Sequence, residues 1–153
     1  MKISRRELFV KLGKGAAYVA VLASLPKIAW AKWNSKAFAS TDLKAAITAK
    51  YGSMSISDSD KVILDAPEIA ENGSVVPITV SSSLPNVASM SLFVENNPTP
   101  LVTSFAMGKG SINEVSIRIR MGKTSNVILL VEADGKLHRA QQEVKVTIGG
   151  CGG

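Results

Sequence analysis

The sequence predicts an all-β fold: an immunoglobulin-like antiparallel β-sandwich, preceded by one short N-terminal helix and followed by a flexible, glycine-rich C-terminal arm. Three observations support this prediction. Short segments rich in valine, isoleucine and serine recur between residues 61 and 148, turn-forming residues separate them, and the clearest segment alternates apolar with polar residues. About seven short strands within about ninety residues are typical of such a sandwich.

The helix is predicted to precede the strands. Thr41 or Asp42 can cap it, and Gly52 can end it. Between them, apolar residues recur at helical spacing on one face, namely Leu43, Ala46, Ile47 and Tyr51. We expect this helix to cover one edge of the domain, with the docking of a partner as the alternative. Residues 53–60 are expected to form a polar loop.

Four strands are predicted in the first part of the sandwich, at residues 61–65, 74–82, 88–95 and 102–107. Each is short, and turn or loop residues lie between them, at Asn72-Gly73, Leu84-Pro85 and residues 96–100. The composition and the turns together favour strands that fold back on each other.

The alternation is clearest in the next segment, where apolar and polar side chains must point to opposite faces of a sheet. The apolar set is Val115, Ile117, Ile119 and Met121, and the polar set is Ser116, Arg118 and Arg120. Two further strands, at residues 126–133 and 137–148, are joined by Asp134-Gly135, which is typical of a tight hairpin turn.

The first thirty-one residues have the layout of an export signal, with a basic start, an uncharged centre over residues 15–25 and an A-x-A site at residues 29–31. Cleavage is expected before Lys32. The adjacent Arg5 and Arg6 resemble a twin-arginine signal, although the usual lysine falls one position late, at Lys11. An ordinary secretory signal remains an alternative. A permanent membrane anchor is disfavoured, because the centre is short and a cleavage site follows it.

The mature chain is then expected to hold a linker over residues 32–40, the helix and sandwich over residues 41–148, and an arm over residues 149–153. We expect a periplasmic protein. Of the 18 basic and 12 acidic residues, six basic and one acidic lie in residues 1–31, which leaves the rest nearly neutral. Nucleic-acid binding is therefore not expected, since it needs a concentrated basic face.

No catalytic or metal-binding constellation is evident, so the sequence predicts no catalytic residue, no metal site and no cofactor. His138 is the only histidine, and the acidic Asp58, Asp60, Glu68 and Glu71 lie in predicted loops without a spacing that would pair them. Arg118 and Arg120 could meet an anion or an acidic partner, but a solvated strand face is the simpler interpretation. The methionines in the sandwich are interpreted as core residues: Met90, Met107 and Met121.

The only cysteine, Cys151, lies in the terminal sequence IGGCGG, flanked by Gly149, Gly150, Gly152 and Gly153. Glycine has no side chain to pack, so this segment is expected to be a thin, mobile arm. No basic residue lies in the arm to favour a thiolate, which indicates a thiol that is acted upon by other proteins. An incidental tail, a prenylation site and a thiocarboxylate-forming Gly-Gly end are all disfavoured. An intermolecular disulfide through Cys151 remains an alternative and is compatible with carrying.

These features together resemble the SoxY family of sulfur carriers of the periplasmic Sox thiosulfate-oxidation pathway. The resemblance lies in the twin-arginine-like start, residues 66–77, Asn97-Pro98, residues 116–121 and the terminal GGCGG. It implies an immunoglobulin-like domain that pairs with a SoxZ-like subunit. It also implies that Cys151 is the covalent attachment site for thiosulfate-derived sulfur, and that the four arm glycines give access.

By the same resemblance, a haem protein of the SoxAX type joins thiosulfate to the thiol. A manganese hydrolase of the SoxB type then removes sulfate, and the remaining sulfur is oxidised by a molybdenum–haem dehydrogenase or passed elsewhere. The chain itself would not be an enzyme. The competing hypothesis is an exported binding or structural module whose tail cysteine cross-links two molecules.

Overall fold

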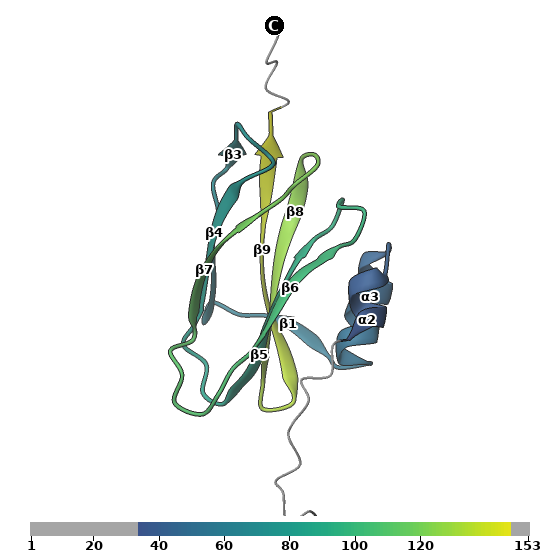
Figure 1. Cartoon of the computed structure of the whole chain (residues 1–153). Coiled ribbons are helices and arrows are strands. Elements are labelled where there is room, and N and C mark those ends of the chain that lie inside the picture. Colours follow the sequence, from purple (N-terminus) through teal and green to yellow (C-terminus); the bar gives the residue numbers. More distant parts are fainter. Residues whose placement is uncertain (1–33, 148–153) are drawn as a thin grey trace, which may run out of the picture. The chain divides into compact units, whose positions relative to one another are not determined.

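The computed structural model describes residues 34–147. The chain divides into two units, residues 1–33 and 34–153, and every described residue belongs to the second unit. In the described domain, two short helices lie against one face of a large sheet, and a smaller sheet lies against the other face (Figure 1). The predicted β-sandwich is confirmed.

The large sheet has six strands and the small sheet has three. The large sheet runs in the order β1-β9-β8-β5-β6, with β3 also pairing with β9. Its strands are β1 (Ile56–Asp58), β3 (Ile69–Ala70), β5 (Val87–Val94), β6 (Leu101–Ala106), β8 (Ser125–Ala133) and β9 (Lys136–Val146). The small sheet, in the order β2-β4-β7, consists of β2 (Val62–Asp65), β4 (Val76–Ser82) and β7 (Glu114–Ile119).

The main core lies between the two sheets and follows from the alternation of side chains along the strands. In β4, for example, Val76, Ile78 and Val80 are buried while Pro77 is exposed. Of the three methionines predicted to fill the core, Met90 and Met121 are buried, and Met107 is partly buried against the same cluster. The hydrophobic effect of this burial is what holds the two sheets together.

Helix α3 (Leu43–Tyr51) was predicted with its cap, which the structure confirms. The Asp42 side chain accepts a hydrogen bond from the Ala45 amide at 2.7 Å, and Gly52 ends the helix with a positive φ of 68°. The helix covers the outer face of the large sheet, where a second apolar cluster includes Phe93, Leu101, Ile128, Leu130 and Leu137.

The predicted linker at residues 32–40 is wrong for its described part, because residues 35–39 form a second short helix, α2 (Ser35–Ala39). The Asn34 side chain accepts a hydrogen bond from the Ala37 amide at 3.1 Å and donates one to the Ala49 carbonyl at 2.8 Å. Asn34 thus caps α2 and ties it to α3. Five residues that bury only Ala37 are too few to show a helical period in the sequence.

The predicted loop at residues 53–60 is also wrong in part, because it contains β1, and β3 was likewise not predicted. Both strands pair with β9 in parallel, whereas the other strand pairs are antiparallel as expected. All three residues of β1 are exposed, so they show no alternation that a sequence could reveal. The predicted hairpin is confirmed, with Asp134 and Gly135 at φ of 49° and 73°.

Candidate functional site

The residues to which the sequence assigns a function lie outside the described range of 34–147. These are the attachment residue Cys151, the arm residues Gly149, Gly150, Gly152 and Gly153, and the signal residues Arg5 and Arg6. What the structure does describe is the place where the arm joins the domain. We call residues 145–147, at the end of β9, the arm base.

The arm base is held by backbone hydrogen bonds on two sides. On one side, the Lys145 amide donates to the Glu68 carbonyl at 2.9 Å, and the Thr147 amide donates to the Ala70 carbonyl at 3.1 Å. On the other side, the Val146 amide donates to the Thr124 hydroxyl at 3.0 Å. The chain is therefore fixed in place to within four residues of Cys151.

Gly73 brings the turn before β4 very close to the arm base. Its carbonyl accepts a hydrogen bond from the Met121 amide at 2.7 Å. A Cβ at this position would lie 2.4 Å from the Met121 carbonyl oxygen and 2.8 Å from Cγ1 of Val146. The Asn72 side chain supports the turn by accepting from the Ser74 amide at 2.9 Å. The sequence indicated a turn here, but it did not reveal the close approach that requires glycine.

A second loop is tied down at the same end of the sandwich. The Asn97 side chain donates to the Arg120 carbonyl at 2.8 Å and accepts from the Gly122 amide at 3.2 Å. Strand β8 begins and β9 ends at this end, because the two strands are antiparallel. Two of the stretches that carry the family resemblance, residues 66–77 and Asn97-Pro98, thus lie at the same end of the sandwich as the arm base.

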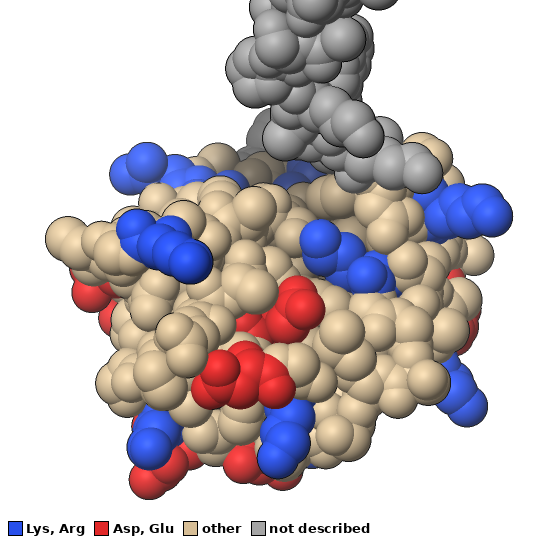
Figure 2. Space-filling view, turned by 90° about the horizontal axis from the view of Figure 1, so that it is seen from below, with Lys and Arg blue, Asp and Glu red and all other residues tan. Residues whose placement is uncertain are grey.

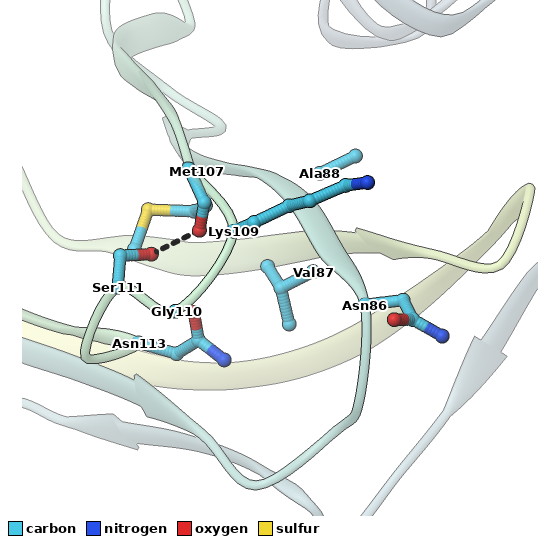
Figure 3. Close-up of a pocket in the computed structure, with 9 residues that line it drawn as sticks. Asn86, Val87, Ala88, Met107, Lys109, Gly110, Ser111 and Asn113 are labelled. Atoms are coloured by element: carbon cyan, nitrogen blue, oxygen red, sulfur yellow. Dashed lines mark hydrogen bonds between the residues drawn. The ribbon is translucent and has the colours of Figure 1, made fainter.

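A cavity of about 550 Å³ lies at the opposite end of the sandwich, between the segments 86–88 and 107–113 (Figure 3). Ser111 donates a hydrogen bond to the Gly108 carbonyl at its edge, at 2.8 Å. Strand β9 separates this end from the arm base by roughly 33 Å, at about 3.3 Å per residue. Four residues beyond Thr147 reach only about 14 Å, so this cavity cannot receive Cys151 of the same chain.

The described residues bring together no catalytic group of the usual kinds. His138 is partly buried on β9, opposite Val131 of β8, and residues 34–147 contain no cluster of three side chains that could hold a metal ion. Arg118 and Arg120 are exposed, as expected of a solvated strand face. Within the same range, no helix is long and apolar enough to cross a membrane.

One predicted loop acid has a partner. Asp58 of β1 accepts two hydrogen bonds from Arg139 of β9, at 2.6 and 3.1 Å, and these bonds lower the pKa of the Asp58 carboxyl. The pair lies beside an open groove formed by residues 58–60 and 139–141. Because both side chains are in contact with solvent, the pair is best explained as a surface link between β1 and β9.

Charges of both signs are interspersed on the end of the domain opposite the arm base. Figure 2 shows acidic side chains near the centre and at the edges of this face, with basic side chains between and around them. The described residues on this face therefore form no continuous basic surface of the kind that nucleic-acid binding needs.

Known proteins resemble this chain in sequence and fold. Residues 47–151 match the family described as sulfur oxidation protein SoxY. The structure of the sulfur carrier protein SoxY from Chlorobium limicola f thiosulfatophilum is 48% identical, with a TM-score of 0.65, and the match covers 70% of this chain and 97% of that one.

A superoxide reductase (neelaredoxin) from Ignicoccus hospitalis has a TM-score of 0.52 over 60% of this chain and 83% of its own. At 17% identity, it shows a similar fold alone. The comparison with curated proteins gives no match. Because the family match spans more than half of the sequence and the Chlorobium protein is covered almost completely, this chain belongs to the SoxY family.

Proposed function

We propose that this chain is an exported sulfur carrier of the Sox system, in which the Cys151 thiol holds thiosulfate-derived sulfur while partner enzymes perform the chemistry. One observation carries the proposal: the SoxY match extends through residue 151 and so includes the only cysteine. The 48% identical Chlorobium protein is itself named a sulfur carrier. The arm base adds support, because its hydrogen bonds fix the chain at Thr147, four positions before this cysteine.

Loading of the carrier is an oxidation. The Cys151 thiol and thiosulfate form a new S–S bond, which gives Cys–S–S–sulfonate and releases one proton and two electrons. The electrons pass to the haem of a SoxAX-type partner. The carrier supplies only the sulfur atom that is bonded, which agrees with an arm that has no basic residue to activate its thiol.

Unloading begins with hydrolysis. Water cleaves the bond between the sulfane sulfur and the sulfonate, which releases hydrogen sulfate and leaves a persulfide on Cys151. A SoxB-type manganese hydrolase performs this step, and a molybdenum–haem dehydrogenase of the same system then oxidises the persulfide sulfur. In this scheme the metals and haems belong to the partners, and the carrier is a substrate that they share.

The proposed site of action is the periplasm, reached by the twin-arginine route through Arg5 and Arg6. This route exports folded proteins, so a SoxZ-like subunit without a signal of its own can travel with the carrier as a heterodimer. Glycines on both sides of Cys151 keep the arm narrow, because a chain without side chains needs the least room in an enzyme channel.

The decisive experiment is an intact-mass measurement of the protein from cells that oxidise thiosulfate. We expect sulfur adducts that disappear on reduction and are absent from Cys151→Ser, together with loss of thiosulfate oxidation in that variant. Unmodified protein and normal oxidation in Cys151→Ser would contradict the proposal. The alternative module with a cross-linking cysteine predicts instead that a disulfide dimer, seen on non-reducing gels, is the working form.

A further inference from the structure

The surface around the arm base is the part of the domain closest to Cys151. Thr147 and Cys151 are four positions apart along the chain, so their Cα atoms lie no more than about 14 Å apart in any conformation. Enzyme active sites that exclude water lie below the protein surface. To bring Cys151 to such a site, the mouth of the enzyme must come within a few ångströms of the arm base. Because the tether is short, the surface around the arm base must lie against each enzyme that receives Cys151.

We propose that this surface docks the enzymes that act on Cys151, through an apolar contact made by Ile69 and Val75. We call these two residues the collar. The inference rests on the proposed carrier function and adds to it the place and chemistry of enzyme binding. The partner that it fits is an enzyme whose active-site mouth has an apolar rim.

The collar residues are unusually exposed for their type. Ile69 is 58% exposed and Val75 is 49% exposed, although isoleucine and valine are among the residues most often buried. Both belong to the segment that turns beside the end of β9: Ile69 pairs with Lys145 in the β3–β9 ladder, and Val75 directly precedes β4. Burial of such side chains against a partner favours binding, because it removes apolar surface from water.

The backbone that carries the collar is fixed before any partner binds. The Val75 amide donates a hydrogen bond to the Asn72 carbonyl at 3.1 Å, and the Gly73 carbonyl accepts one from the Met121 amide at 2.7 Å. Because the collar needs no ordering on docking, most of the contact energy remains available for binding.

The charges beside the collar favour neither a positively nor a negatively charged partner. Glu68 and Glu71 are exposed on the side of β3, and Lys123 and Lys145 are exposed on the other strands near the arm base. Opposite charges on one exposed surface largely cancel and are screened by salt. Affinity at this surface is therefore expected to depend on the apolar pair and to change little with ionic strength.

The test uses the full mature chain, with its partner subunit, loaded chemically at Cys151. Tetrathionate serves for loading: the Cys151 thiolate attacks one of its central sulfurs, forms Cys–S–S–sulfonate and displaces thiosulfate. Intact mass confirms the loading. Sulfate release by the hydrolase of the system is then followed for the wild type, Ile69→Asp and Val75→Asp.

Two other exposed residues serve as matched controls. Ile63, on β2, is 55% exposed, and Ile112, in the loop before β7, is 84% exposed. We expect each collar variant to lower kcat/KM by about tenfold with kcat retained, as the loss of about 1.4 kcal/mol of docking energy requires. Ile63→Asp and Ile112→Asp should stay within about twofold of the wild type. All four variants should melt at the wild-type temperature, because the altered side chains are exposed.

Three outcomes would overturn the inference. These are unchanged kcat/KM in both collar variants, an equal loss in the controls, and dissociation of the partner subunit or of a dimer on substitution of the collar. The last result, seen by size-exclusion chromatography, would show that another chain covers the collar. Failure of the carrier function itself looks different, because the hydrolase would then release no sulfate from the loaded wild type.

Discussion

Gly73 is a residue whose identity is dictated by its neighbours. An added Cβ would lie 2.4 Å from the Met121 carbonyl oxygen. Met121 cannot easily move away, because its amide donates a hydrogen bond to the Gly73 carbonyl. The substitution Gly73→Ala must therefore push the turn away from the arm base. We expect it to lower the free energy of unfolding by about 1–3 kcal/mol, as overpacked positions do. Urea unfolding followed by circular dichroism measures this change.

Gly122→Ala is the matched control for this prediction. Gly122 lies in the adjoining turn, but a Cβ there would meet nothing within 4 Å. Its free energy of unfolding should stay within about 0.5 kcal/mol of the wild type. If the two variants proved equally stable, the close packing of the turn at residue 73 against the arm base would be refuted.

One hydroxyl group of helix α3, that of Tyr51, forms hydrogen bonds with the large sheet. Tyr51 donates a hydrogen bond to Ser91 at 2.6 Å and lies 3.3 Å from the Ser89 hydroxyl. Ser91 in turn donates to Ser104, and Ser89 donates to Glu132. Burial raises the pKa of the Tyr51 hydroxyl, while its hydrogen bonds with Ser89 and Ser91 act against this rise. The helix layer is thus attached by a buried polar network as well as by apolar contacts.

Tyr51→Phe should lower the free energy of unfolding by about 1 kcal/mol at neutral pH, because both serines keep other partners. The wild type should also lose stability as the pH rises through about 10, since the unfolded chain releases the tyrosine proton there and the folded chain retains it. This part of the alkaline loss should be absent from Tyr51→Phe. Urea unfolding of both proteins at neutral and alkaline pH tests the prediction, and parallel pH profiles would contradict it.

The elements that the sequence predicted are those with side-chain periodicity or a turn signal. Composition and flanking turns located β4, alternation located β7, and Asp134-Gly135 located the hairpin before β9. The elements that were missed show no side-chain pattern and depend on contacts with other segments. Strand β1 is exposed along its whole length and depends on its parallel pairing with β9, and α2 is tied to α3 by the side chain of Asn34. Such contacts arise only when distant segments have already come together.

The residues of the candidate site also differ in whether the sequence alone could reveal them. Cys151 could be identified from the sequence because it is the only cysteine and lies among glycines. Both features are visible without a structure. The collar could not, because nothing in residues 69–75 says that this turn lies beside the end of β9. Only the pairing of Ile69 with Lys145 and the contact of Gly73 with Met121 reveal it.

At the scale of the whole molecule, the export route determines whether the partner subunit can leave the cytoplasm together with this chain. A carrier that leaves the cytoplasm folded can bring along a subunit that has no signal. An ordinary secretory signal requires positive charge near its start but no particular basic residue, whereas a twin-arginine signal requires the arginine pair itself. Replacement of Arg5 and Arg6 by lysines keeps the charge and removes the pair, so it separates the two routes.

We expect the variant with Arg5→Lys and Arg6→Lys to remain in the cytoplasm as uncleaved precursor, with its partner subunit retained there. Cell fractionation, immunoblotting of both subunits and intact mass, which detects cleavage before Lys32, measure the outcome. The control is Lys11→Arg with Lys14→Arg, which also conserves charge and should leave export unchanged. Normal export of the lysine pair would point to the ordinary secretory route. Since that route exports unfolded chains, the two subunits would then have to meet in the periplasm, and the partner would need a signal of its own.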